Sequence, residues 1–192
     1  MKLKHMMYIA LFAAVVGVLG FFPPITLPVI PVPITLQTLG VMLAGGILGA
    51  RRGGLSLLLF LLLLCIGLPL LAGGRGGIGP LVAPGGGYIL SWPVAAFVIG
   101  YLVEKNFRRL GYVNVFVYNW IGGVLLINLC GITFMSVTGD LPWVATAISS
   151  MIFLPGDTAK AVIASYVTVK FNRLYPIIRQ KDQPANERKG AS

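Results

Sequence analysis

Charged residues are scarce in this sequence of 192 residues. Only 10% of the residues are Asp, Glu, Lys or Arg and 57% are apolar, whereas ordinary soluble domains have about 25% charged and about 45–50% apolar residues. This composition excludes a soluble globular domain. Since one membrane-spanning helix needs about 20 predominantly apolar residues, the length is sufficient for about five or six spans.

Cysteine and histidine are nearly absent too. Cys65 and Cys130 each lie inside an apolar run with no second cysteine or histidine at ligand spacing, and the single histidine, His5, is near the N-terminus. The sequence therefore predicts neither a disulfide nor a metal site.

The motifs of common enzyme classes are also missing. There is no Walker A loop, HExxH, CxxC or GxSxG. Residues 74–79 match G-x-G-x-x-G formally, but that fingerprint needs a preceding strand and a following helix, and here an apolar run precedes it and Pro80 follows. We expect no enzyme and no cofactor, so any ATP must be used by a partner protein.

The apolar residues gather in six runs, which are bounded by charges or by clusters of glycine and proline. Helices are the expected structure because these runs show no alternation typical of a barrel. The first run could also be a signal peptide, but Pro23-Pro24 follows it in place of a cleavage site. The predicted spans are Met6 to Phe22, Ile34 to Ala50, Leu55 to Ala72, Tyr88 to Val103, Tyr112 to Ser136 and Leu141 to Val169.

The positive charges predict how these spans are oriented. The net charge is +10, which in a soluble protein would suggest a nucleic-acid partner. With both termini in the cytoplasm, however, 13 of the 15 basic residues fall on the cytoplasmic side, as the positive-inside rule requires. We therefore predict an all-α polytopic protein of the cell (plasma) membrane with six transmembrane helices and no bound nucleic acid. Residues 1–180 would form a single membrane domain, followed by a polar, disordered tail at 181–192.

Two segments on the predicted outer side differ from the short basic connections inside. Segment 23–35 carries five of the 13 prolines, which favour a stiff, extended path. Segment 73–87 carries eight glycines. One stiff and one freely bending apolar loop are typical of a lid over an outward-facing pocket.

Asp157 and Lys160 are the only acid and base inside any predicted span. Each would cost about 2.5–3.5 kcal/mol at the centre of a membrane helix, so each needs a partner. Spaced i and i+3, the two could simply pair with each other and fix helix packing. A binding role is favoured because Pro155-Gly156 is expected to break the helix there, leaving Asp157 near the start of a half-helix in the outer half of the membrane.

Other polar residues are weaker candidates for the same site. Gln37, Thr35 and Thr38 stand at the outer end of the second span, and Arg75 and Tyr88 flank the glycine-rich loop. Trp92, Trp120 and Trp143 are interpreted as interface anchors or packing residues. Ala10 and Ala14 form a small-x-x-x-small pattern on the first span, which permits close approach of another helix, within this chain or from a partner.

Five ordered motifs carry a resemblance that covers nearly the whole chain. The sequence resembles the BioY family, the biotin-specific substrate-binding (S) components of energy-coupling factor (ECF) transporters. That family has six transmembrane helices with cytoplasmic termini. The motifs are Pro31-Val32-Pro33-Ile34-Thr35-Leu36-Gln37, Gly45-Gly46-Ile47-Leu48-Gly49, Gly67-Leu68-Pro69 leading to Gly73-Gly74-Arg75-Gly76-Gly77, Pro84-Gly85-Gly86-Gly87-Tyr88, and Pro155-Gly156-Asp157-Thr158-Ala159-Lys160.

The resemblance implies capture of biotin from outside, with Asp157 and Lys160 in the pocket. It also implies a transmembrane coupling subunit and two cytoplasmic ATPases as partners, with Ala10 and Ala14 docking on the coupling subunit. Some relatives carry Asn at the position of Arg75 and Arg at the position of Ile89, so the positive charge of this region would here come from the loop.

The predicted substrate-binding residues are Asp157, Lys160, Arg75, Tyr88 and Gln37. Two alternatives stay open. The chain could be an S component for another small vitamin, since the pocket sets the cargo, or a structural or assembly membrane protein whose Asp157 and Lys160 only hold helices together.

Overall fold

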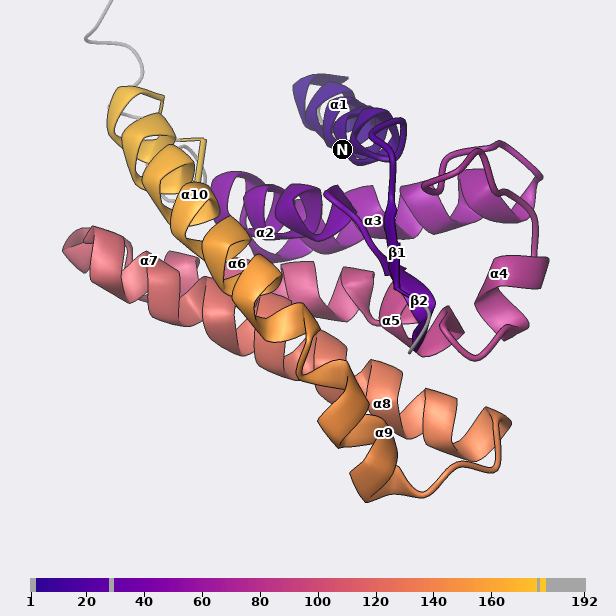
Figure 1. The fold of residues 1–192 in the computed structure, drawn as a ribbon. Helices are drawn as coiled ribbons and strands as arrows, with labels where there is room; N and C mark the ends of the chain where they lie inside the picture. The colour runs from indigo at the N-terminus through magenta and orange to yellow at the C-terminus, as the bar shows by residue number, and fades with distance from the viewer. Residues whose placement is uncertain (1–2, 28–29, 176, 179–192) are drawn as a thin grey trace, which may run out of the picture.

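The computed structural model describes residues 3–27, 30–175 and 177–178. All six apolar runs are helical, and the helices pack side by side in a bundle (Figure 1). The helices are α1 (Leu3–Leu19), α2 (Gln37–Leu48), α3 (Ala50–Cys65), α4 (Gly79–Val82), α5 (Gly86–Leu90), α6 (Trp92–Lys105), α7 (Tyr112–Asn119), α8 (Ile127–Thr138), α9 (Trp143–Ser150) and α10 (Phe153–Leu174), with a 3-10 turn η1 (Phe107–Arg109) and a π-helical segment η2 (Trp120–Leu126) joining α7 to α8.

Helix lengths support a membrane protein. Among the described residues, the continuous stretches Gly86–Lys105 and Tyr112–Thr138 are long and apolar enough to cross a membrane, and α9 with α10 makes a third candidate bent by 52°. Leu3–Leu19 and Gln37–Leu48 are apolar but shorter. The prediction of an all-α polytopic membrane protein is therefore confirmed, while the count of six spans stays a prediction.

A small β-hairpin interrupts the helices between α1 and α2. β1 (Ile25–Leu27) pairs antiparallel with β2 (Ile30–Ile34), with Ile25 opposite Ile34. The extended path predicted for segment 23–35 is present in its described strands, 25–27 and 30–34, but the pairing of these two strands was not foreseen. Prolines are tolerated in β2 because a strand paired on one side leaves the N–H groups of its other edge unused.

The bend in the last membrane segment lies earlier than predicted. α9 ends at Ser150 and α10 begins at Phe153, so the turn is at Met151 and Ile152 and not at Pro155-Gly156. Pro155 is the third residue of α10. Since N–H groups in the first turn of a helix have no intrahelical partner, a proline there breaks nothing. The prediction of a break at Pro155-Gly156 was wrong, and Asp157 lies one turn inside α10.

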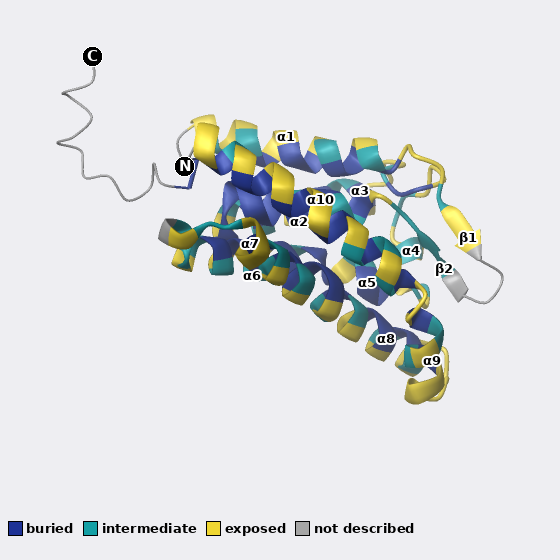
Figure 2. Ribbon diagram, turned by 60° about the vertical axis from the view of Figure 1, so that its left-hand side comes forward, coloured by how far each residue is buried: buried dark blue, intermediate teal, exposed yellow. Residues whose placement is uncertain are grey.

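Helix α2 lies at the centre of the bundle, and nearly all of it is buried (Figure 2). Two consecutive glycines let it approach two neighbours. A Cβ added to Gly45 would lie 2.5 Å from the carbonyl oxygen of Ala96 on α6, and one added to Gly46 would lie 2.5 Å from Thr168 Oγ1 on α10. This close packing fixes α2 between α6 and the C-terminal half of α10.

Candidate functional site

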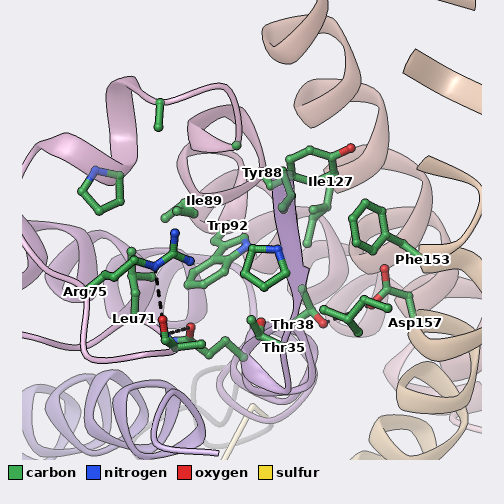
Figure 3. Close-up of a pocket in the computed structure, with 18 of the residues that line it drawn as sticks. Thr35, Thr38, Leu71, Arg75, Tyr88, Ile89, Trp92, Ile127, Phe153 and Asp157 are labelled. Carbon is green, nitrogen blue, oxygen red and sulfur yellow. Dashed lines mark hydrogen bonds between the residues drawn. The ribbon is translucent and has the colours of Figure 1, made fainter. Parts of the chain in front are cut away.

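A cavity lies between the hairpin, the glycine-rich segment and the helices beneath them (Figure 3). Its walls combine many apolar side chains with a few polar ones, as in sites for small organic molecules. All five residues predicted to bind substrate line it. The lining residues are Val32, Pro33, Ile34, Thr35, Gln37, Thr38, Leu71, Ala72, Arg75, Pro80, Ala83, Pro84, Gly85, Tyr88, Ile89, Trp92, Ile127, Phe153, Asp157 and Lys160.

A buried ion pair forms one side of this cavity. Lys160 Nζ lies 2.8 Å from Asp157 Oδ1, and both side chains are at least nine-tenths buried. The ammonium also donates to the carbonyl oxygen of Thr35 at 2.6 Å and to Thr38 Oγ1 at 3.0 Å. An ammonium has three N–H donors, so the donors of Lys160 are all used within the protein.

The carboxylate of Asp157 is less fully bonded than its partner. Its Oδ1 accepts from Lys160 Nζ and from the hydroxyl of Thr38, the latter at 3.2 Å. Its Oδ2 makes no hydrogen bond to any residue in the described part of the chain. The cavity is thus lined by a carboxylate that is fixed through one oxygen and keeps acceptor capacity on the other.

Arg75 contributes a cation to another part of the wall. Its Nε donates to the carbonyl oxygen of Ala72 at 3.2 Å, which bends the side chain back over its own loop. The isolated bridge between Leu71 and Arg75 closes that loop. Neither Nη group has a hydrogen-bond partner within the described residues. Ile89 lines the same cavity (Figure 3).

Tyr88 and Gln37 differ in what they can offer a ligand. The hydroxyl of Tyr88 is 3.0 Å from Ser150 Oγ, and its ring packs edge-on against Phe153, with the two ring centroids 5.8 Å apart. Gln37 is buried, and its Nε2 donates to the carbonyl oxygens of Val16 and Leu70 while its Oε1 accepts from the N–H of Ala72.

The amide of Gln37 therefore joins α1, α2 and the segment that carries Arg75. It shapes the wall through these bonds. A similar bracing role falls to the Tyr88–Ser150 pair, which connects α5 to α9 near the bend.

Some wall residues were not predicted. Trp92 is 4% exposed and packs against Phe60, with ring centroids 5.6 Å apart, so it is a packing residue and part of the cavity wall, not an interface anchor. Phe153 and Ile127 line the wall without any sequence signal beyond their place in an apolar run. Ser150, the hydrogen-bond partner of Tyr88, does not itself line the cavity, and nothing in the sequence indicated this partnership.

Ala10 and Ala14 are not among the residues that line this cavity. Both are exposed on α1, while Ile9, Ala13 and Val16 of the same helix are buried. The small-residue pair therefore does not serve packing between the described helices of this chain.

The fold and the site together define a class, namely a helical membrane protein with a small-molecule cavity built around one buried ion pair. The BioY family matches residues 1–177. The chain belongs to the BioY family.

Relatives cover most of the chain. "Biotin transporter BioY" of Rhizobium etli is 43% identical over 93% of this chain and 98% of its own length. "Probable biotin transporter BioY" of Bacillus subtilis is 40% identical over 90% of this chain and 92% of its own length. Among solved structures, the S-component for biotin from an ECF-type ABC transporter superimposes with a TM-score of 0.86 at 34% identity, covering 90% of this chain and 92% of that one.

Proposed function

We propose that this chain is the membrane subunit that binds biotin on the outer side of the cell membrane for ATP-driven uptake through an energy-coupling factor module. Relatives named as biotin transporters and a solved S-component for biotin support the substrate and the role. The observation that carries the proposal is the fixed carboxylate of Asp157, which keeps one oxygen free in a mostly apolar cavity. These relatives are transporters, and no enzymatic step is proposed.

The chemistry of biotin suits this cavity. Its ureido ring carries two N–H donors, and a carboxylate acceptor that is already oriented is their natural partner. In the proposed complex, Asp157 Oδ2 accepts from a ureido N–H. Lys160 holds Asp157 in place and presents its charge beside the ureido carbonyl, and the apolar walls cover the ring sulfur and the aliphatic chain.

The carboxylate of biotin is assigned to Arg75. The two unused Nη groups of Arg75 match a carboxylate in geometry and charge. Tyr88 supplies wall area, and Gln37 holds the wall in shape through its three protein hydrogen bonds. The positive charge thus comes from the loop, with Ile89 as an apolar residue of the same cavity.

The proposed topology follows the distribution of basic residues. Six spans with both termini in the cytoplasm put Arg51, Lys105 and Lys170 on the inner side and Arg75 on the outer side. One membrane domain over residues 1–180 is proposed, and the predicted tail at 181–192 lies outside the described residues.

Three partners complete the proposed transporter, a transmembrane coupling subunit and two cytoplasmic ATPase subunits. This chain has no phosphate-binding loop, so the energy must reach it through contact with another protein. The exposed pair Ala10 and Ala14 is the proposed contact, because small residues let a partner helix approach closely.

Equilibrium binding of radiolabelled biotin to the purified chain tests the proposal. We expect saturable binding that unlabelled biotin displaces and that thiamine and riboflavin do not. Asp157→Asn should weaken it, while Asp140→Asn, which changes an exposed acid in a loop, serves as the matched control. Binding of another vitamin in preference to biotin would assign a different cargo, and no binding of either would favour the structural role.

A further inference from the structure

Two stacked tyrosines and two cations lie on the exposed seam between α7 and α10. The rings of Tyr112 and Tyr166 are stacked, with centroids 5.7 Å apart and planes inclined by 15°. The guanidinium carbon of Arg173 is 5.5 Å from the centroid of Tyr112, and Lys170 Nζ is 5.7 Å from the centroid of Tyr166. We call these four residues the tyrosine–cation cluster.

The cluster is built by two helices that run in opposite directions. Tyr166, Lys170 and Arg173 follow the spacing i, i+4, i+7 on α10 and so share one face. Tyr112 is the first residue of α7, so it meets the C-terminal end of α10. The tyrosines are 43% and 53% exposed, and both cations are exposed.

These cations have no acidic partner within the described residues. The salt bridge formed there is the Asp157–Lys160 pair, which lies in the cavity. Ring faces hold the long side chains of Lys170 and Arg173 in place without neutralising them. Two positive charges held side by side are prepared for an anion, because less side-chain freedom is lost when it binds.

The residues beside the cluster show what kind of anion fits. Toward the middle of the membrane, α10 exposes Val162 and Ile163, which lie one turn before Tyr166 on the same face. A surface that is cationic at the membrane boundary and aliphatic deeper in matches a molecule with a charged head and apolar chains. Tyrosine is also typical of the level of lipid headgroups.

We infer that the tyrosine–cation cluster binds the phosphate of an anionic phospholipid, whose acyl chains lie along the exposed aliphatic residues of α10. Basic sites between membrane helices are suited to such headgroups. The inference concerns a surface separate from the cavity, and it goes beyond the proposed capture of biotin.

Native mass spectrometry of the full chain tests this site. The purified protein is mixed with equal amounts of phosphatidylglycerol and phosphatidylcholine with the same acyl chains, and the retained lipids are counted. We expect selective retention of phosphatidylglycerol. The double substitution Lys170→Gln with Arg173→Gln should lower that selectivity about tenfold or more, since each cation near an anionic lipid surface contributes about fivefold.

Matched variants distinguish lipid binding by the tyrosine–cation cluster from attraction of lipid by any exposed positive charge. Arg51→Gln with Lys105→Gln removes the same charge from exposed positions on α3 and α6. It should lower selectivity clearly less than the substitutions at 170 and 173, because these two cations lie on different helices and are not held together over ring faces. Tyr112→Leu with Tyr166→Leu keeps both cations and should lower selectivity severalfold. If the double substitution at 170 and 173 prevents folding, judged by size-exclusion chromatography and circular dichroism, each single substitution should still lower selectivity about fivefold.

Three outcomes would overturn the inference. One is unchanged selectivity in the variants at Lys170 and Arg173, and another is an equal loss in the control at Arg51 and Lys105. The third is full displacement of the lipid by excess glycerol 3-phosphate, which would show a site for a soluble anion that does not use the acyl chains.

Discussion

The hydroxyl of Thr38 on α2 donates to Asp157 Oδ1 on α10 at 3.2 Å and accepts from Lys160 Nζ at 3.0 Å. One short side chain thus fixes both members of the buried ion pair. Because the Thr38 hydroxyl bonds to Oδ1 of Asp157, the other carboxylate oxygen, Oδ2, stays available to a ligand. Thr38 is a positioning residue in this arrangement, and Asp157 is the proposed ligand-binding group.

Removal of the Thr38 hydroxyl should therefore weaken biotin binding indirectly. Thr38→Val keeps the shape but leaves two buried charged groups each short of one hydrogen bond, a loss of about 1–3 kcal/mol. We expect the Kd for biotin to rise about tenfold. Thr38→Ser should restore most of the affinity, because it returns the hydroxyl, and equal Kd values for the Val and Ser variants would contradict a positioning role.

Substitutions in the ion pair itself should weaken biotin binding more than substitution of Thr38 does. Asp157→Asn and Lys160→Ala each leave a buried charged group without its partner, and each should weaken biotin binding more than tenfold. Both single variants should also be less thermally stable than the double variant, which leaves no unpaired charge. Near-wild-type binding by both single variants would return the pair to a purely structural role.

The helices and the ion pair could be predicted because their signals are local. Apolar runs predict the helices, and the i, i+3 spacing of Asp157 and Lys160 predicts that the two residues share one helical face. The partners Thr35 and Thr38 are 125 and 122 residues away from Lys160 in sequence, so no local pattern could identify them as its hydrogen-bond acceptors. The bend at Met151 and Ile152 has neither proline nor glycine to mark it, so the proline–glycine pair at 155 and 156 indicated the wrong position.

The proposed contact between Arg75 and the carboxylate of biotin can be tested by changing either the protein or the ligand. If its guanidinium binds the carboxylate, Arg75→Gln should weaken binding of biotin about tenfold, a modest value because the side chain is exposed and screened by water. The same substitution should hardly change binding of biotin methyl ester, which lacks the charge. Equal losses for acid and ester would show that Arg75 acts on the fold of the loop.

The two segments over the cavity should become more ordered when biotin binds. Residues of β2 and of the stretch 73–87 line its outer walls, and the backbone amides of a closing lid exchange more slowly. Hydrogen exchange followed by mass spectrometry should show slower exchange in both segments with biotin, while the exposed α8–α9 connection at 139–142 serves as an internal control. Identical exchange with and without ligand in both segments would rule out this lid.

The last prediction separates binding from energised uptake. Ala10 and Ala14 are exposed on α1, whereas the cavity is built from the hairpin, α2, the 71–85 segment with α4, α5, α6, α8 and α10. Replacing both alanines by Leu would hold a partner helix away by bulk, which removes the close approach that small residues permit. We expect the Kd for biotin of the isolated chain to stay within about twofold, while co-purification with the coupling subunit and ATP-driven uptake both fall sharply. A matched control makes the same kind of substitution on another helix, Ala145→Leu at an exposed position of α9, and should leave assembly and uptake unchanged. Normal assembly and uptake by the Ala10 and Ala14 variant would move the partner contact to another surface. Loss of biotin binding would instead show that α1 supports the cavity, a connection that runs through the hydrogen bond from Gln37 to Val16.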